Sequence, residues 1–433
     1  MNWKKIYADK LCTADEAVSQ IKSGNRVVVA HACGEPVILT DAMTANAEKY
    51  GYENVEVVHM VAMGKAGYCA PEMEKHFRHN GLFLGGSTKD AVAEGRADFT
   101  PVFFSEVPEL FASTLPVDVV LLQVTEPDEH GYCSYGISCD YTKAAAEHAK
   151  IKIAQINENM PRVMGDNFIH ISELDYIVAE NTELIQLAPP KIGDVQRKIG
   201  ENVASLVQDG DCLQLGIGAI PDAVLLFLKE KKNLGIHSEM FSDGVVELIE
   251  AGVITNKCKQ IDKGQCVATF LMGTDRLYDY VNDNPSVCLK PVDYVNDPRV
   301  ICQNDNVVSI NSCVEVDLMG QVCSESVGLK QISGVGGQVD FVRGANMSKN
   351  GRTIMAMPAT AAKGTVSRIV PFLAHGATVT TSRCDADYVV TEYGIAQLHG
   401  RTLRDRAKQL IAIAAPQFRP ALQEEYERRF HES

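Results

Sequence analysis

Residues 212–238 constrain the fold of this chain more than any other stretch. The sequence predicts a short strand over residues 212–215, a glycine-containing loop over residues 216–221, and a helix over residues 222–232 with Pro221 at its first position. A second strand is predicted from Leu234 to Ser238. This order of strand, helix and strand makes a βαβ unit, in which the two strands run parallel.

Glu239 follows the second predicted strand and is the candidate nucleophile of the chain. Because parallel strands place their carboxyl ends at one edge of the sheet, we expect the glycine loop and Glu239 to lie side by side, where open α/β sheets bind ligands. The loop offers backbone N–H groups and a helix N-terminus, which suit a phosphate or a thioester oxygen. His237 is expected to pack or to orient its neighbours, with a catalytic base as the alternative.

Taken alone, each of these features has an ordinary structural explanation. Gly216-Ile217-Gly218 could be only a tight strand-to-helix turn. It lacks the third glycine of the dinucleotide-binding fingerprint and the Lys-Ser/Thr pair of a P-loop. A glutamate between a strand and a loop is usually solvated or caps a helix.

The length of the chain and an internal similarity predict two domains. A chain of 433 residues is too long for one ordinary domain. The order helix, glycine, strand, small-residue loop and helix occurs near Gly24 and again near Gly210, which indicates a duplication, although any βαβ unit has this order. We therefore expect an α/β fold of two similar open domains with mostly parallel sheets, residues 1–190 and 191–433, joined by a linker within residues 181–193. The active site is expected in the cleft between them.

Composition restricts the possible partners. The formal net charge of −15 argues against nucleic acid and anionic membranes. No apolar run approaches the ~20 residues of a membrane-spanning helix. The chain has 13 cysteines and no secretory signal ahead of them, so we expect a cytoplasmic protein with reduced thiols. The cysteines form no C-x-x-C pair, and no metal site is expected.

A second glycine-rich motif is more informative than the first. Residues 333–341 read Ser-Gly-Val-Gly-Gly-Gln-Val-Asp-Phe, with three glycines in four positions. Such a stretch leaves backbone amides that a ligand can approach closely and that can donate hydrogen bonds to it.

Three motifs together resemble those of the acetyl-CoA hydrolase/transferase family, one of the family I CoA-transferases. They are Gly-Ile-Gly-Ala-Ile-Pro at 216–221, Ser-Glu-Met-Phe-Ser-Asp-Gly at 238–244 and Gly-Val-Gly-Gly-Gln-Val-Asp-Phe at 334–341. The resemblance extends over essentially the whole chain. It implies transfer of CoA between an acyl-CoA, such as acetyl-CoA or butyryl-CoA, and a short-chain carboxylate, with 4-hydroxybutyrate as the expected acid. Butyryl-CoA:acetate transfer and acyl-CoA hydrolysis are the alternatives.

The resemblance also implies a mechanism and a set of site residues. Glu239 would attack the thioester and then carry CoA as a glutamyl thioester, so that CoA is a substrate and no permanently bound cofactor or metal is needed. The expected catalytic residues are Glu239, Gly336, Gly337 and Asn296. Those expected to bind CoA are Gly216, Ile217, Gly218, Ala219, Ile220, Asn311, Gly336 and Lys363, and those expected to contact the acid are His31, Gly34 and Glu35.

Other classes of function fit the sequence less well. A CoA- or nucleotide-binding regulator without chemistry would not require both Glu239 and the glycine loops. A nicotinamide oxidoreductase would need the full dinucleotide fingerprint, which neither half has. The expected partners are small molecules and further copies of the chain, in a homodimer or a larger homo-oligomer.

Overall fold

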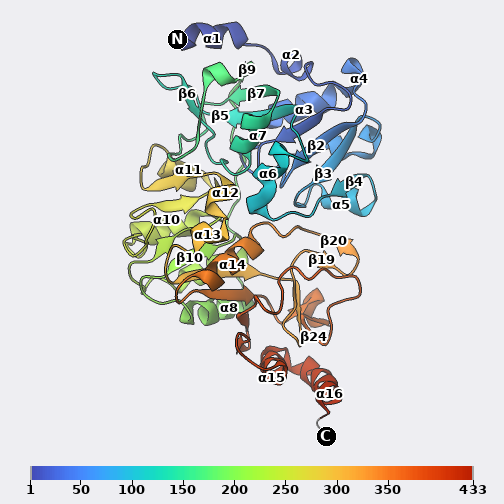
Figure 1. Ribbon diagram of the computed structural model, residues 1–433, viewed down its shortest axis with the longest axis vertical. Helices are drawn as coiled ribbons and strands as arrows, with labels where there is room; N and C mark the ends of the chain where they lie inside the picture. The colour runs from blue at the N-terminus through green and yellow to red at the C-terminus, as the bar shows by residue number, and fades with distance from the viewer. Residues whose placement is uncertain (1, 432–433) are drawn as a thin grey trace. The chain divides into compact units, whose positions relative to one another are not determined.

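A computed structural model describes residues 2–431, and the chain in it divides into two units. The first unit comprises Met1–Leu187 and Val267–Val295, and the second comprises Ala188–Cys266 and Asn296–Ser433. The first boundary lies within the predicted linker, where residues 181–193 form neither helix nor strand. Residues 267–295, which include the helix labelled α11 (Asp275–Val281) in Figure 1, belong to the first unit. The sequence pattern had grouped them with the second half.

The first unit is built on a parallel sheet. Its strands are β1 (Arg26–Val29), β2 (Val55–His59), β3 (Phe77–Gly81), β4 (Ala97–Phe99), β5 (Val119–Val124), β7 (Ile151–Ile156) and β9 (Tyr176–Ala179). They follow the order β4-β3-β2-β1-β5-β7-β9, and each neighbouring pair is parallel. Every residue of the central strand β5 is buried, as expected for a parallel strand that is covered on both faces.

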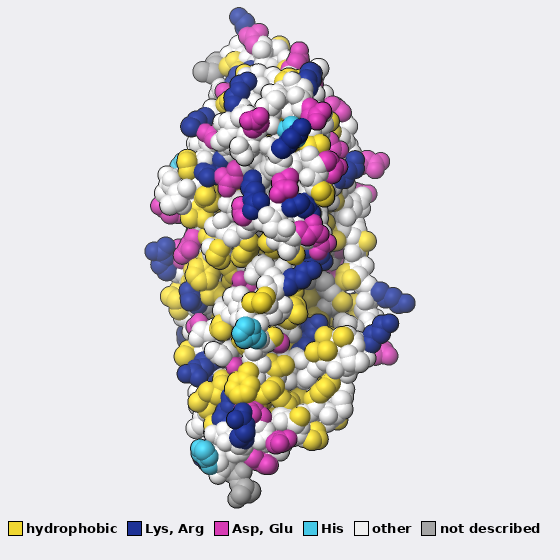
Figure 2. All heavy atoms as spheres, turned by 90° about the vertical axis from the view of Figure 1, so that its right-hand side faces the viewer, with side chains coloured by type: hydrophobic (Ala, Val, Ile, Leu, Met, Phe, Trp, Pro, Cys, Tyr) yellow, Lys and Arg dark blue, Asp and Glu magenta, His cyan; other side chains and the backbone are white. Residues whose placement is uncertain are grey.

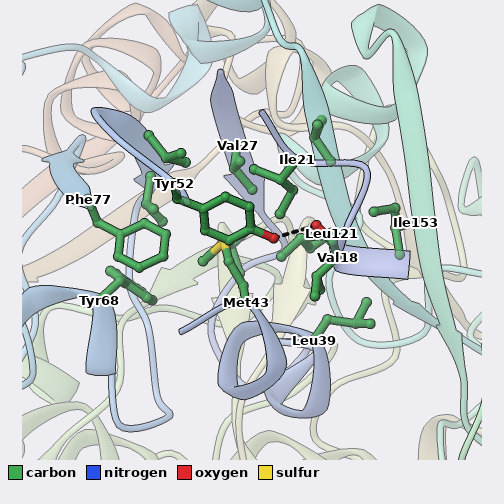
Figure 3. Packing of buried hydrophobic residues seen from close by; sticks show 14 of the residues in the cluster. Val18, Ile21, Val27, Leu39, Met43, Tyr52, Tyr68, Phe77, Leu121 and Ile153 are labelled. Carbon is green, nitrogen blue, oxygen red and sulfur yellow. Dashed lines mark hydrogen bonds between the residues drawn. The ribbon is translucent and has the colours of Figure 1, made fainter. Parts of the chain in front are cut away.

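Helices pack against this sheet and bury an apolar core. In the part of the core drawn in Figure 3, Leu39 and Met43 of α3 (Val37–Ala45) lie in one cluster with Leu121 of the sheet. The hydroxyl of Tyr52 donates to the carbonyl of Val18 at 2.5 Å, so its polar group is satisfied inside the core. The other elements of this unit are α1 (Trp3–Lys10), α2 (Ala14–Val18), α4 (Ala47–Tyr50), α5 (Lys89–Ala93), α6 (Val107–Ala112), α7 (Thr142–His148), α11 (Asp275–Val281), α12 (Val292–Val295), β6 (Tyr132–Ser134), β8 (Phe168–His170), β14 (Phe270–Leu271) and β15 (Val287–Leu289), with β13 (Cys266–Ala268) beginning at the boundary.

The second unit repeats the order of parallel strands. Its main strands are β10 (Cys212–Leu215), β11 (Gly235–Ile236), β16 (Val307–Ser312), β21 (Arg352–Ala356) and β25 (Tyr388–Thr391). They follow the order β11-β10-β16-β21-β25 with parallel neighbours, as β2-β1-β5-β7-β9 do in the first unit. Antiparallel strands β12 (Met240–Phe241) and β26 (Gly394–Gln397) pair with β10 and β25. The expected α/β fold of two similar domains with mostly parallel sheets is therefore confirmed.

Close helix packing positions the glycine loop of the second unit. Helix α8 (Asp194–Ser205) contacts α9 (Ala219–Leu226) through Gly200, where a Cβ would lie 2.7 Å from the backbone of Ala223. The absence of a side chain at this residue lets the two helices approach. The other elements are α10 (Asp243–Glu250), α13 (Pro298–Ile301), α14 (Gln338–Met347), α15 (Leu403–Ile413), α16 (Arg419–Phe430), β17 (Glu315–Asp317), β18 (Val322–Cys323), β19 (Ser326–Val327), β20 (Lys330–Gln331), β22 (Thr360–Ala361), β23 (Val366–Ser367) and β24 (Ile369–Val370).

Helix α9 begins and ends earlier than the sequence pattern predicts. Gly218 precedes it with φ +114°, a conformation that other residues rarely adopt, and this turn starts the helix at Ala219. Pro221 is therefore the third helical residue rather than the first. It is tolerated there because the N–H that proline lacks would have had no partner within the helix. The helix ends at Leu226 instead of residue 232.

The surface mixes charges of both signs. On the face drawn in Figure 2, Lys and Arg side chains are interspersed with Asp and Glu, and apolar side chains lie between them. Within residues 2–431, no helix combines the length and the apolar character needed to cross a membrane.

Candidate active site

Glu239 lies where the chain turns back beside β10. It separates β11, which is parallel to β10, from the antiparallel β12. The hydroxyl of Ser238 fixes this turn, since it lies 2.7 Å from the Met240 carbonyl and accepts the Leu215 N–H at 3.2 Å. Leu215 ends β10, so Glu239 is held beside the start of the glycine loop, as expected for groups at one edge of a parallel sheet.

A buried lysine supports the strand that leads to Glu239. Lys259 is 1% exposed, and its ammonium donates to the carbonyls of Ile236 at 2.9 Å and Gln265 at 2.7 Å. Asn256 accepts the Ile236 N–H at 2.8 Å. Neither residue stands out in the sequence, because a lysine and an asparagine in a polar loop are usually solvated.

Asn296 and Gly337 meet at the Glu239 carboxylate. Asn296 is fully buried, and its Nδ2 donates to Glu239 Oε2 at 2.8 Å. A Cβ at Gly337 would overlap both the Glu239 carboxylate and the Asn296 amide, so only glycine fits there. Gly336 has φ +53°, so this loop needs glycine at two successive positions. The structure thus brings the four predicted catalytic residues together.

This arrangement suits chemistry at a carboxylate. Glu239 is partly exposed and can meet a substrate carbonyl, while a buried amide and a glycine loop lie beside its oxygen. Amide N–H groups in such a position can stabilise negative charge that develops on a carbonyl oxygen.

A cavity of about 270 Å³ lies at the glycine loop in the second unit. Of the residues expected to bind CoA, Ile217, Gly218, Ala219 and Ile220 line it. A Cβ at Gly216 or Gly218 would meet nothing within 4 Å, so the space above both glycines is open. The rest of the lining comes from Gln196, Pro221, Ser312, Cys313, Ala356, Met357, Pro358 and Arg368.

The other four residues expected to bind CoA, which are Gly216, Asn311, Gly336 and Lys363, do not line this cavity. The Asn311 amide donates to Gln214 Oε1 at 3.1 Å and to Ser309 Oγ at 2.9 Å, so it is engaged with neighbours on β10 and β16. Lys363 is exposed between β22 and β23, in a left-handed conformation with φ +56°. Arg368 lines the cavity instead. This arginine was not predicted, because a single arginine in a loop carries no distinguishing pattern.

In the first unit, His31 forms a buried pair with Asp140. The two residues are 2% and 0% exposed, and His31 Nδ1 lies 3.0 Å from Asp140 Oδ2. The other oxygen of Asp140 accepts from the backbone and the hydroxyl of Thr142, both at 3.0 Å. Phe270 contacts the imidazole edge-on, with ring centroids 4.5 Å apart. Asp140 was not among the predicted residues, because 109 positions separate it from His31.

Gly34 and Glu35 hold neighbouring loops of the first unit. The Glu35 carboxylate is 2% exposed and accepts from the Gly64 N–H at 2.8 Å and the Thr40 hydroxyl at 3.3 Å. Burial raises the pKa of Glu35. A Cβ at Gly34 would lie 2.8 Å from the Cβ of Ser138. Both residues therefore have structural contacts inside the unit.

Metal-binding geometry is absent from the described chain. Within residues 2–431, no group of three or more His, Cys, Asp or Glu side chains is placed to hold a metal ion.

Comparison with known proteins assigns the chain to a family. Its residues 1–189 match the acetyl-CoA hydrolase/transferase N-terminal domain, and residues 273–426 match the C-terminal domain of the same family. A 4-hydroxybutyrate coenzyme A transferase of Clostridium kluyveri is 64% identical over 431 residues, which are 99% of this chain and 100% of that protein. The chain belongs to the acetyl-CoA hydrolase/transferase family. The resemblance inferred from the three motifs is confirmed.

Other members of the acetyl-CoA hydrolase/transferase family match over nearly the full length. A butyryl-CoA:acetate CoA-transferase of Anaerostipes caccae is 38% identical, across 98% of this chain and 97% of its own. The crystal structure of a 4-hydroxybutyrate CoA-transferase from Porphyromonas gingivalis is 48% identical and has a TM-score of 0.86, with 99% of this chain and 100% of that chain covered. Both units of this chain therefore have counterparts in members of the acetyl-CoA hydrolase/transferase family.

Proposed function

We propose that the chain is a CoA-transferase that moves CoA between an acyl-CoA and a short-chain carboxylate, with 4-hydroxybutyrate as the preferred acid. The observation that carries the proposal is the Glu239 carboxylate held 2.8 Å from the buried amide of Asn296, beside a glycine that leaves no room for a side chain. The choice of acid is supported by the similarity to the 4-hydroxybutyrate coenzyme A transferase of Clostridium kluyveri.

The reaction proceeds through two acyl exchanges at Glu239. Its carboxylate attacks the thioester carbonyl and the carbon–sulfur bond breaks. CoA departs as the thiolate, and a mixed anhydride of the acyl group and Glu239 remains. The thiolate then attacks the glutamyl carbonyl and the anhydride C–O bond breaks, which releases the donor acid and leaves a glutamyl–CoA thioester. A second carboxylate reverses these steps, forms the new acyl-CoA and restores Glu239. One thioester replaces another, so no ATP is consumed and CoA is a substrate rather than a resident cofactor.

Carboxylates are weak nucleophiles, so the site has to stabilise the oxyanion of each tetrahedral intermediate. Asn296 Nδ2 and a backbone amide at Gly336 or Gly337 are the donors in this proposal. Removing one such donor costs about 3–4 kcal/mol of transition-state stabilisation in acyl-transfer enzymes.

Binding of the two substrates is assigned to different loops. Gly216 to Ile220 hold the CoA chain, and binding energy from this long, unreactive part orients the thioester. The acid contacts the loop that carries His31, Gly34 and Glu35 in the first unit. His31 hydrogen-bonds the terminal hydroxyl of 4-hydroxybutyrate.

An acceptor screen tests this function. Butyryl-CoA or acetyl-CoA is incubated with acetate, butyrate, 4-hydroxybutyrate or water alone, and the CoA esters are identified by mass. We expect 4-hydroxybutyryl-CoA to form fastest and free CoA to accumulate little. Rapid release of free CoA without any added acid would instead identify an acyl-CoA hydrolase.

We also propose a cytoplasmic homodimer or larger homo-oligomer. Some large apolar side chains are strongly exposed in the single chain, among them Leu329 at 83% and Val327 at 58%. Light scattering after gel filtration is expected to give at least twice the mass of one chain. A monomer at micromolar concentration would contradict this proposal.

A further inference from the structure

Among the described residues that line the cavity at the glycine loop, Arg368 alone is positively charged. Its backbone is fixed on both sides, since its N–H donates to Ala359 and its carbonyl accepts from Val316, each at 2.9 Å. The cavity lies at the carboxyl ends of β10, β16 and β21, where Ser312 and Ala356 end their strands and contribute to the lining. Parallel sheets bind ligands at this edge.

The guanidinium of Arg368 has a buried nitrogen without an acceptor among residues 2–431. Its Nε is buried and forms no hydrogen bond within residues 2–431, and the side chain forms no ion pair there. Burying a charged donor without an acceptor destabilises a fold, so an anion in the cavity would satisfy Arg368.

The N-terminus of α9 faces the same cavity. Ala219 and Ile220, the first two residues of this helix, line the cavity, and Gly218 before them supplies no side-chain cap. The free N–H groups of a helix N-terminus attract anions. Two independent elements, the helix end and the arginine, therefore present positive character to one space.

The remaining surface of the cavity favours a ligand that is larger than a simple anion. Ile217 is 39% exposed, Met357 and Pro358 add apolar lining, and the space above Gly216 and Gly218 is open. A phosphate group carried on a partly apolar chain matches both the charge and the apolar surface. A short carboxylate would match only the charge.

We propose that Arg368 binds a phosphate group of the CoA substrate in this cavity. The identity of the ligand rests on the proposed function, whereas the anion site rests on the contacts of Arg368. Lys363, which the family resemblance suggested as a CoA-binding residue, is exposed and lies outside the lining. Among the described residues that line this cavity, Arg368 is therefore the cation placed to bind CoA.

The decisive experiment combines a substitution with a truncated substrate. In Arg368→Gln, the KM for acyl-CoA is expected to rise about 10- to 100-fold, the usual loss for a charge-assisted hydrogen bond. The kcat and the KM for the acid should change less than about 3-fold. With acyl-pantetheine, which has no phosphate of the nucleotide part, wild type and Arg368→Gln should have equal kcat/KM.

Arg428→Gln is the matched control. Arg428 belongs to the same unit, its side chain is 69% exposed, and it pairs with Glu425 within α16. This variant should keep the wild-type KM for acyl-CoA. An unchanged KM in Arg368→Gln would overturn the proposal. An equal loss with acyl-CoA and acyl-pantetheine would also overturn it, because the arginine would then act only through packing.

Direct binding separates this inference from the proposed function. If the wild type transferred CoA to no carboxylate, the proposed function would fail, but the affinity for CoA itself could still be measured by calorimetry. Wild type should bind CoA at least about 10-fold more tightly than Arg368→Gln, with a steeper loss of affinity as NaCl is added. Equal affinities and equal salt dependence would refute the anion site.

Discussion

The carboxyl group of Glu239 decides whether the proposed chemistry exists. Incubation with acyl-CoA and no acid should increase the mass of the intact protein by that of CoA less one water, because one glutamyl oxygen leaves with the released acid. The adduct should accumulate, since a glutamyl thioester is about as reactive as the substrate thioester. The label should map to the peptide that carries Glu239 and should be discharged by hydroxylamine. Glu239→Gln should form no adduct and transfer no CoA.

Glu239→Asp refines this prediction. Aspartate is one methylene shorter, and a displacement of about 1 Å can cost ~10²-fold in a positioned reaction. Transfer should fall by about that factor, and part of the remaining activity should shift towards hydrolysis. Wild-type transfer by Glu239→Gln, with CoA attached elsewhere or nowhere, would disprove the mechanism.

Gly337 offers a second test, which asks whether the glycine loop positions the Glu239 carboxylate. In Gly337→Ala the new methyl would displace the Glu239 carboxylate and the Asn296 amide, so we expect kcat to fall by about 10²-fold or more. The KM for acyl-CoA should change little. Gly86→Ala is the control, because a Cβ at Gly86 meets nothing within 4 Å. Equal kcat values in the two variants would show that Gly337 has no part in positioning Glu239.

Single residues could be predicted only where a motif surrounds them. Glu239 and Gly337 lie within recognisable sequence motifs. The role of Asn296 was predicted from the family resemblance. Arg368 and Lys259 have no such context. Their importance comes from a guanidinium Nε that has no acceptor within residues 2–431 and from a buried ammonium. Both depend on segments distant in sequence and become visible only in three dimensions.

Helix α9 carries a carboxyl group whose protonation should change stability with pH. Burial raises the pKa of Asp222 to about 6, although a hydrogen bond to Ser242 opposes the shift. This pKa is higher in the folded than in the unfolded chain, so protonation of Asp222 contributes to the free energy of unfolding. That contribution is fully present below about pH 4. It is lost as the pH rises through about 6.

Asp222→Asn should therefore stabilise the protein at neutral pH. Allowing for partial exposure, we expect a gain of about 1 kcal/mol, or about 2–4 °C in Tm, at pH 7.5. The difference from wild type should shrink towards zero near pH 4. Thermal unfolding of the wild type and Asp222→Asn between about pH 4 and pH 7.5 measures this difference in Tm. A gain that is independent of pH would show that charge on Asp222 is not the cause.

The loop after β1 gives a prediction for the choice of acid. Asp140 accepts from His31 Nδ1, which leaves Nε2 able to accept a hydroxyl proton. His31→Ala and Asp140→Asn should each lower the preference for 4-hydroxybutyrate over butyrate by roughly 10-fold, judged by kcat/KM. The double variant should lose no more than either single one.

Two results would count against this arrangement. An unchanged preference in His31→Ala would remove the imidazole from the acid site. If adding Asp140→Asn to His31→Ala lowered the preference for 4-hydroxybutyrate as much as Asp140→Asn does alone, Asp140 would act through other contacts. Those with Thr142 are an example. Thermal unfolding of each variant separates a loss of fold from a change in preference.

At this scale, strands were predicted better than helix ends. The strand β10 follows the predicted residues 212–215, because buried parallel strands are short and continuously apolar. The start of α9 was misplaced because proline was taken as the first helical residue. The positive φ of Gly218, which starts the helix earlier, leaves no separate mark in the sequence.

The division into two units followed the sequence only in part. The duplicated pattern and the linker anticipated a boundary near residue 187. The return of residues 267–295 to the first unit was not anticipated. Hydrophobic periodicity reports whether a segment is buried, but it does not report which of two similar cores buries it.

The return of residues 267–295 to the first unit has a consequence for recombination between related genes. The chain passes from one unit to the other at residues 187–188, 266–267 and 295–296, so no single crossover separates the units. A chimera joined only at the linker would inherit α11 and α12 from one parent and residues 1–187 of the first unit from the other. Exchanging one whole unit between two related genes needs three junctions. The last junction falls immediately before Asn296, the residue that contacts Glu239.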